Sequence, residues 1–291
     1  MIVCPAVSRL RAGGGLPREP VGPVAWTPVP STETAPAKGP HVDLTTCSAL
    51  SFDCYGTLID WEAGIAAVLV PWAARRGSEL DEEALLVAYS DREAEVEREH
   101  PGWRYPDVLR EAFRRTGAAL GLEVDDADAD ALGRSVPDWP AFPDSAEALE
   151  RLGRRYRLII LSNVDREGFA GSNRRLGVEF DAIWTAEDIG SYKPADANFD
   201  YLLEHLGELG VEREGLLHVA QSLFHDHVPA KRRGLPTVWI NRRHDRPGWG
   251  ATPDPRAEVA PDLEFPSLAA FADAVDAAFD GAGASGEPAG S

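Results

Sequence analysis

The sequence predicts an α/β protein whose parallel β-sheet is covered by helices on both faces, with an all-helical segment inserted after the first strand. Short apolar runs alternate with amphipathic stretches along most of the 291-residue chain, which is typical of a parallel sheet. Residues 61 to about 138 are the exception, because they show helical spacing and no convincing strand.

Five short apolar runs are expected to form the strands. The first leads into a turn that contains glycine, and the second has four consecutive large apolar residues followed by a polar end. Amphipathic stretches at 145–156 and 198–209 are expected to form helices, one before the second strand and one between the third and the fourth. The five runs are residues 48–52, 157–163, 182–188, 215–222 and 235–241.

The same pattern divides the chain into a core, an insertion and two tails. We expect the α/β core at 47–60 and 140–280, and the helical insertion at 61–139, where it could close as a lid over the strand ends. Residues 1–46 and 281–291 are rich in proline, glycine and small residues, which cannot bury enough apolar surface to offset the entropy of ordering. We therefore predict that both tails are disordered.

Charge and cysteine content narrow the classes of partner. The formal net charge is −19 and the pI is about 4.7. Such an acidic surface repels nucleic-acid phosphates and anionic lipids, so we expect neither nucleic acid nor a membrane as a partner. The N-terminus lacks the uninterrupted apolar region of a signal peptide, and the three cysteines lack the spacing of a metal or redox motif. These features predict a cytoplasmic protein with reduced thiols.

Polar side chains stand where the predicted strands end. The first strand ends at Asp53 and the second at Ser162 and Asn163, while the third leads to Lys193 and the fourth to Asp226. In open α/β sheets, ligands bind beyond the carboxyl ends of the strands, near a switch in strand order. These residues would supply that edge with a nucleophile, hydrogen-bond donors, a cation and a second carboxylate.

Four segments in this order resemble the motifs of the haloacid dehalogenase superfamily. They are FDCYGTLID at 52–60, LSN at 161–163, the YKP around Lys193, and HVAQSLFHDHVPAKRRGLPTVWINR at 218–242. The resemblance implies a hydrolase with a Rossmann-like core and a helical cap of the C1 type, placed where the insertion lies.

The resemblance also implies roles for the residues that match. Asp53 would be the catalytic nucleophile, which forms a covalent ester that water then cleaves. Lys193 would neutralise Asp53 and Asp226, since two neighbouring carboxylates otherwise raise each other's pKa. Asp226 would hold the lysine or orient the hydrolytic water.

Four further residues are expected to bind substrate. Ser162 and Asn163 would donate hydrogen bonds to the carboxylate or phosphoryl oxygens of a small anionic substrate. Thr57 would donate its hydroxyl either to Asp53 or to the substrate. Tyr55 completes this set, because its position in the first motif bears on the chemistry.

Residue 55 favours one chemistry over another. Phosphatases of this superfamily carry a second aspartate at the corresponding position, and this aspartate protonates the departing alkoxide. A halide, in contrast, leaves without a proton. With Tyr55, the first motif resembles that of the 2-haloacid dehalogenases. This resemblance implies hydrolysis of a carbon–halogen bond without a cofactor. Those enzymes also carry a cap arginine that receives the halide. Here Tyr89 or Ser90 stands near that point, with Arg92 displaced.

Two alternatives stay open. A Mg²⁺-dependent phosphatase would bind the ion through Asp53 and Asp226, since Mg²⁺ prefers oxygen ligands. A catalytically silent binding module would explain why Gln221, Leu223 and Phe199 replace polar residues of the dehalogenase motifs. An apolar helix of the insertion could support a homodimer in any of these cases.

Overall fold

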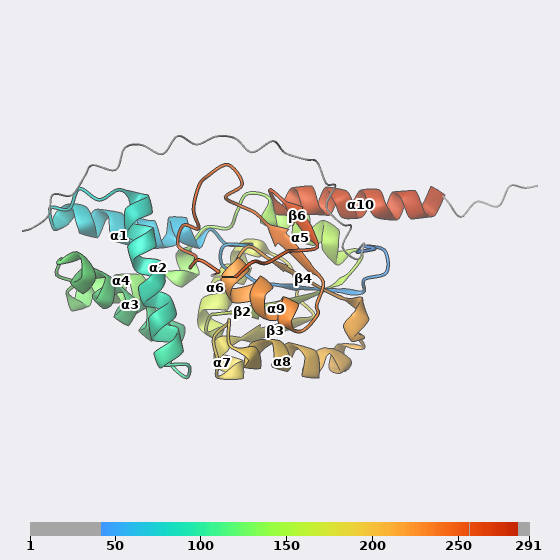
Figure 1. Ribbon diagram of the computed structural model, residues 1–291, viewed down its shortest axis with the longest axis horizontal. Coiled ribbons are helices and arrows are strands. Elements are labelled where there is room, and N and C mark those ends of the chain that lie inside the picture. The colour runs from blue at the N-terminus through green and yellow to red at the C-terminus, as the bar shows by residue number, and fades with distance from the viewer. Residues whose placement is uncertain (1–41, 256, 285–291) are drawn as a thin grey trace, which may run out of the picture. The chain divides into compact units, whose positions relative to one another are not determined.

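The computed structural model describes residues 42–255 and 257–284, and within them six parallel strands form one sheet (Figure 1). The sheet order is β3-β2-β1-β4-β5-β6. This arrangement confirms the predicted fold class. The strands are β1 (Ala49–Phe52), β2 (Arg157–Ser162), β3 (Ala182–Thr185), β4 (Leu216–Ala220), β5 (Thr237–Ile240) and β6 (Leu263–Phe265).

Two details of the sheet differ from the expectation. The run at 182–188 is a strand only to Thr185, because the Thr185 side chain caps the short helix α7 (Ala186–Ile189) in a capping box with Asp188. The edge strand β6 was not predicted. It is three residues long and its residues are partly exposed, so the sequence contains no apolar run there.

The first strand lies where the order of the sheet reverses. β1 pairs with β2 on one side and with β4 on the other, so Phe52 lies between Ile160 and Val219. The backbone continues beyond the strand, where the Asp53 N–H donates to the Val219 carbonyl at 3.1 Å. Asp53 therefore stands at the switch point, where ligands bind in open α/β sheets.

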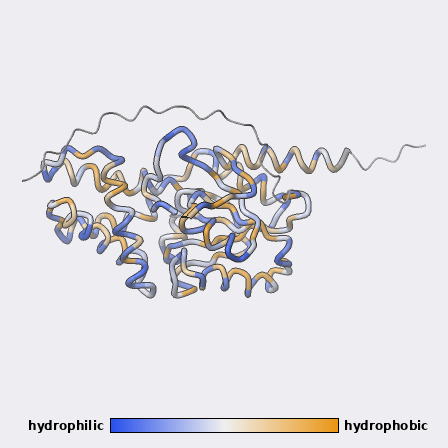
Figure 2. Tube along the Cα trace, in the orientation of Figure 1, coloured by the Kyte–Doolittle hydropathy of each residue, from blue (hydrophilic) through white to orange (hydrophobic). Residues whose placement is uncertain are grey.

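Alternating side chains of the strands build a core on each face of the sheet. Leu50 and Phe52 belong to one apolar cluster, which includes residues of α5 (Ser145–Gly153), α6 (Arg166–Leu176) and α10 (Leu268–Ala284). Ala49 belongs to the other, with α8 (Asp196–His205) and α9 (Val228–Arg232). Figure 2 shows the hydrophobic stretches gathered in the sheet.

The insertion is all-helical, as predicted. It contains α1 (Trp61–Arg75), α2 (Glu82–Glu99), α3 (Tyr105–Leu120) and α4 (Asp126–Gly133), followed by the short turn η1 (Val136–Asp138). Aspartates at positions 60, 81 and 125 cap the first, second and fourth of these helices by accepting backbone N–H groups.

The predicted tails lie largely outside the described residues, as does Cys4. Residues 42–46, which we had assigned to the N-terminal tail, form a turn in which Leu44 is buried and its carbonyl accepts the Tyr156 hydroxyl. Residues 281–284 are the end of α10.

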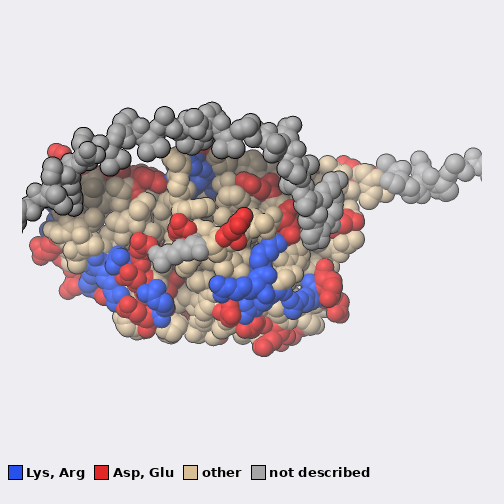
Figure 3. Space-filling view, in the orientation of Figure 1, with Lys and Arg blue, Asp and Glu red and all other residues tan. Residues whose placement is uncertain are grey.

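Acidic and basic side chains are interspersed on the face shown in Figure 3. None of the described helices combines the length and the apolar composition that a membrane span requires.

Candidate active site

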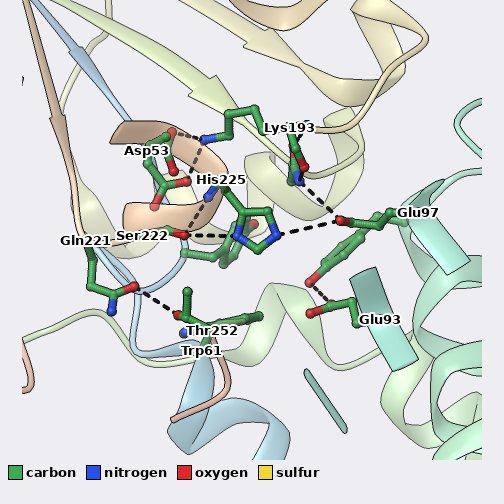
Figure 4. Close-up of a pocket in the computed structure, with 13 residues that line it drawn as sticks. Asp53, Trp61, Glu93, Glu97, Lys193, Gln221, Ser222, His225 and Thr252 are labelled. Atoms are coloured by element: carbon green, nitrogen blue, oxygen red, sulfur yellow. Dashed lines mark hydrogen bonds and ion pairs between the residues drawn. The ribbon is translucent and has the colours of Figure 1, made fainter. Parts of the chain in front are cut away.

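The ammonium group of Lys193 is the centre of the site (Figure 4). Its side chain is 1% exposed, and Nζ donates to Asp53 Oδ1 at 2.9 Å and to Asp226 Oδ1 at 2.7 Å. The third hydrogen bond goes to the Leu161 carbonyl at 2.8 Å. Since an ammonium group has three N–H donors, all of them are used. The structure thus brings together the nucleophile, the cation and the second carboxylate of the sequence prediction.

Asp53 is fixed by the turn that follows β1. Its second oxygen, Oδ2, accepts the Thr57 hydroxyl at 2.7 Å, and Thr57 Oγ1 in turn accepts the Gln221 backbone N–H at 2.9 Å. Gly56 has a φ of +90°, which lets the chain fold back so that Thr57 reaches Asp53. Burial raises the pKa of Asp53, and the attraction to Lys193 opposes this effect.

Asp226 is held by a buried chain of polar groups. Its Oδ1 lies 3.0 Å from His218 Nε2, and His218 Nδ1 lies 2.8 Å from Ser51 Oγ. Burial alone would raise the pKa of Asp226, but Lys193 and the hydrogen bond to His218 outweigh it and lower that pKa. Sequence reasoning missed Ser51 and His218. Two polar residues within apolar strand sequences are the signal that could have identified them.

Asn163 positions the lysine rather than leaving its amide free for a substrate. Its Oδ1 accepts the Lys193 backbone N–H at 2.7 Å, and its Nδ2 donates to the Lys193 carbonyl at 2.9 Å and to Glu97 Oε1 at 3.2 Å. Ser162 Oγ is buried and makes no hydrogen bond to any described residue. Substrate binding by these two residues stays a prediction.

Tyr55 points its hydroxyl into the core. The OH lies 2.9 Å from Ser172 Oγ of α6, and the ring meets Trp139 edge-on at 5.4 Å between centroids. The residue lines the cavity beside Asp53, but its hydroxyl has a protein partner. The Tyr55 hydroxyl is therefore already hydrogen-bonded within the protein.

The cap contributes two buried glutamates that sequence reasoning missed. Glu93 and Glu97 of α2 are 4% and 6% exposed, and both line a cavity of about 30 Å³ together with Asp53. Glu93 Oε1 accepts the hydroxyls of Tyr105 at 2.8 Å and Tyr89 at 3.2 Å. Burial raises the pKa of Glu93 to about 7, and that of Glu97 well above its ordinary value. Both glutamates continue the apolar face of α2 at helical spacing, which was the available signal.

His225 connects the cap glutamate to the core. Its Nδ1 lies 3.0 Å from Ser222 Oγ, and its Nε2 lies 4.0 Å from Glu97 Oε2 (Figure 4). Burial lowers the pKa of His225 to about 4, so the imidazole is neutral at neutral pH.

The opposite side of the cavity holds Trp61 of α1, Gln221 and Thr252. Thr252 donates its hydroxyl to Gln221 Oε1 at 3.2 Å. Within the described part of the chain, the Trp61 indole N–H and the Gln221 amide N–H groups make no hydrogen bond. They are the unused nitrogen donors of the site.

The cap provides no cation at the expected halide position. Tyr89 donates to Glu93, the Ser90 hydroxyl donates to the Val87 carbonyl, and Arg92 pairs with Glu95 at 2.8 Å. Among the described residues, Lys193 is the one lysine or arginine that lines the cavity.

A magnesium ion at this site would have to share both carboxylates with the Lys193 ammonium. Oδ1 of Asp53 and Oδ1 of Asp226 both contact the Lys193 ammonium, and Asp53 Oδ2 accepts Thr57. Mg²⁺ requires near-octahedral oxygen coordination. Over residues 42–255 and 257–284, no group of three or more His, Cys, Asp or Glu side chains is placed to hold a metal ion.

Comparisons with known proteins agree with this fold. A family model described as haloacid dehalogenase-like hydrolase matches residues 47–219. A defluorinating L-2-haloacid dehalogenase superposes with a TM-score of 0.64 and 23% identity, covering 79% of this chain and 95% of that one. Another L-2-haloacid dehalogenase superposes with a TM-score of 0.65 and 24% identity, covering 79% of this chain and 99% of that one. The L-2-haloacid dehalogenase from Xanthobacter autotrophicus with chloropropionic acid covalently bound superposes with a TM-score of 0.62 and 22% identity, covering 79% of this chain and 98% of that one. At these identities the likeness shows a shared fold. No curated protein is similar enough to match the chain.

Proposed function

Because the chain belongs to the haloacid dehalogenase-like hydrolase family, we propose that it cleaves a carbon–halogen bond through an ester formed on Asp53. The observation that carries this proposal is the Asp53 carboxylate, held at 2.9 Å by the Lys193 ammonium, beside a tyrosine whose hydroxyl is tied to Ser172. Asp53 supplies the nucleophile. Tyr55 stands where a phosphatase would carry the aspartate that protonates the leaving group, so the leaving group finds no acid there.

The first step is a displacement at carbon. An oxygen of Asp53 attacks the carbon that bears the halogen, a carbon–oxygen bond forms, and the halide leaves with the electron pair of the broken bond. Lys193 favours the ionised form of Asp53, because its ammonium attracts the carboxylate and opposes the burial that raises its pKa. Thr57 fixes the orientation of the carboxylate through its 2.7 Å hydrogen bond.

The departing halide needs hydrogen-bond donors rather than a proton. The Trp61 indole N–H and the Gln221 amide line the cavity and are unused by the described residues. A Cβ atom built on Gly56 would lie 3.0 Å from Gln221 Oε1 and 3.1 Å from Trp61 Nε1. Both side chains therefore lie over the same turn. We assign them to the halide, in the place of the absent cap arginine.

Hydrolysis of the ester is the second step. Water attacks the ester carbonyl of Asp53, releases an alcohol and restores the carboxylate, with one proton released overall. His225 is the base that we assign to this water, because its imidazole is buried, neutral and oriented by Ser222 at the edge of the cavity.

Halide release from a panel of small chlorinated, brominated and fluorinated compounds tests the proposal. We expect release that is lost in Asp53→Asn, and retained in Asp91→Asn, the same change at an exposed position of α2. Phosphate release abolished by EDTA would contradict the proposal in favour of a phosphatase. Ligands that raise the melting temperature while no product forms would contradict it in favour of a binding module.

A further inference from the structure

The catalytic cavity has an excess of carboxyl groups. Asp53, Asp226, Glu93 and Glu97 line it, against the single ammonium group of Lys193. All three hydrogen bonds of that ammonium are used within the protein. A carboxylate or phosphate on the substrate would therefore find no unpaired cation, and would add negative charge to a buried, acidic site.

Several of these carboxyl oxygens have unused capacity to accept hydrogen bonds. Asp226 Oδ2 is fully buried and has no partner. Both hydroxyls that reach Glu93 go to Oε1, and no described residue donates to its Oε2. Glu97 Oε2 has His225 Nε2 as its nearest partner, at 4.0 Å, which exceeds a hydrogen bond. A buried acceptor without a donor is costly, so the unpartnered Asp226 oxygen indicates a ligand that brings donors.

The two glutamates lie one turn apart on α2 and face the nucleophile (Figure 4). Burial raises the pKa of both carboxyl groups, and a positive group between them would favour their ionised forms. The described side chains offer no cluster of three His, Cys, Asp or Glu residues for a metal ion. An organic cation that donates hydrogen bonds meets both requirements.

We propose that the substrate carries an ammonium group, which binds between Glu93 and Glu97 while Asp53 attacks the carbon that bears the halogen. This inference rests on the proposed function and names its substrate class, a small haloalkylammonium ion, in place of the anion that the sequence led us to expect. Water and the haloalkylammonium ion give the hydroxyalkylammonium ion, halide and one proton. The small cavity, of about 30 Å³, favours a small substrate.

Three substrates that share a primary carbon–chlorine bond separate the charge requirement from the chemistry. They are 3-chloropropylammonium, 3-chloropropanol and 3-chloropropionate. We expect the highest kcat/KM for the ammonium compound and the lowest for the carboxylate. Removing one member of a buried charge pair corresponds to about a 30-fold loss or more, so Glu93→Gln and Glu97→Gln should lower kcat/KM for the ammonium substrate by at least about that factor.

The neutral alcohol should change far less in these variants. Glu95→Gln is the matched control, since Glu95 lies on the same helix, pairs with Arg92 and does not line the cavity. It should leave the preference among the three substrates unchanged. Release of chloride only from 3-chloropropionate, dependent on Asp53, would overturn the ammonium inference while the proposed function stands.

A binding measurement separates the two claims if no chloride is released. Propylammonium and propionate lack a leaving group, so their effect on the melting temperature of the intact protein reports recognition alone. A rise with propylammonium that Glu97→Gln removes would support the ammonium site even if the proposed chemistry failed. A rise with propionate alone, or with neither compound, would overturn the ammonium site.

Discussion

One ammonium group compensates two buried carboxylates in this protein. Lys193 lies between Asp53 and Asp226, and both partners are almost fully removed from solvent. Burial alone would lower the pKa of the lysine, but its attraction to the two aspartates raises it. The cation therefore does more than neutralise a surface charge, because without it two negative charges would face each other in the interior.

Replacement of Lys193 tests how much this cation contributes to the stability of the fold. We expect Lys193→Met to lower the free energy of unfolding by about 3–5 kcal/mol, the usual cost of breaking a buried ion pair. The same change at Lys231, which pairs with Asp262 near the surface, should cost about 1 kcal/mol or less. Urea unfolding measures both. Equal losses would show that the buried triad is not special.

The neutral imidazole of His225 gives a kinetic prediction. If it activates the water of the second step, His225→Gln should form the ester on Asp53 and fail to cleave it. The variant is mixed with an organohalide that the natural protein hydrolyses. Mass spectrometry of the intact variant should then show an increase by the mass of the organic group bound to Asp53. A variant that stays unmodified but inactive would assign His225 to the first step instead.

The central residues of the site could be predicted from sequence, whereas their surroundings could not. Asp53, Lys193 and Asp226 follow strands, and parallel strands deliver their carboxyl ends to one edge. Glu93 and Glu97 come from a helix of the insertion, and the face that a cap helix turns to the core depends on tertiary packing. The partners of Asn163 depend on the same packing, because they are the Lys193 backbone and a cap residue.

At the scale of elements, the turn after β1 controls the site. Gly56 has a φ of +90°, and a Cβ there would approach Gln221 and Trp61. We expect Gly56→Ala to cost about 1 kcal/mol or more of stability and to reduce halide release. Gly77→Ala is the control, since Gly77 has a φ of +76° with open space around it. It should cost similar backbone strain and leave activity intact. Equal activity in both variants would contradict the role of this turn.

Helix α2 should give the protein a measurable pH dependence. Glu93 has its pKa raised from 4.5 to about 7, so the folded state holds a proton that the unfolded state loses between these values. Its contribution to stability is present below pH 4.5 and is lost as the pH rises towards 7. The loss is at most about 3 kcal/mol.

Comparison with an isosteric variant isolates this contribution. We expect Glu93→Gln to gain stability relative to the natural protein as the pH rises from 4.5 to 7. The Gln oxygen can still accept the two tyrosine hydroxyls. Curves of unfolding free energy against pH that run parallel for the two proteins would contradict the raised pKa.

The elements themselves were predictable to different degrees. Five strands are apolar runs that fill both faces of a covered sheet, and their sequences identify them. The edge strand β6 lacks that signal because its residues are partly exposed. The end of β3 depends on a capping box at Thr185, which a count of apolar residues does not register.

For the molecule as a whole, the cavity beside Asp53 depends on the insertion as much as on the core. The cap supplies the two glutamates, and Trp61 opens its first helix. A segment after β5 ties the two parts together, since Arg243 pairs with Glu62 at 2.9 Å and with Glu83 at 2.6 Å. Asp53 of the core is therefore enclosed by side chains that a core without its cap would lack.

The most direct test of the whole account is oxygen-isotope labelling during turnover. After many turnovers of an organohalide in H₂¹⁸O, mass spectrometry of peptides should find heavy oxygen in the peptide that contains Asp53, because water attacks the ester at its carbonyl carbon. Lys193→Met should take up none. Heavy oxygen found only in the product alcohol, with the Asp53 peptide unlabelled, would contradict a covalent ester and with it the central claim.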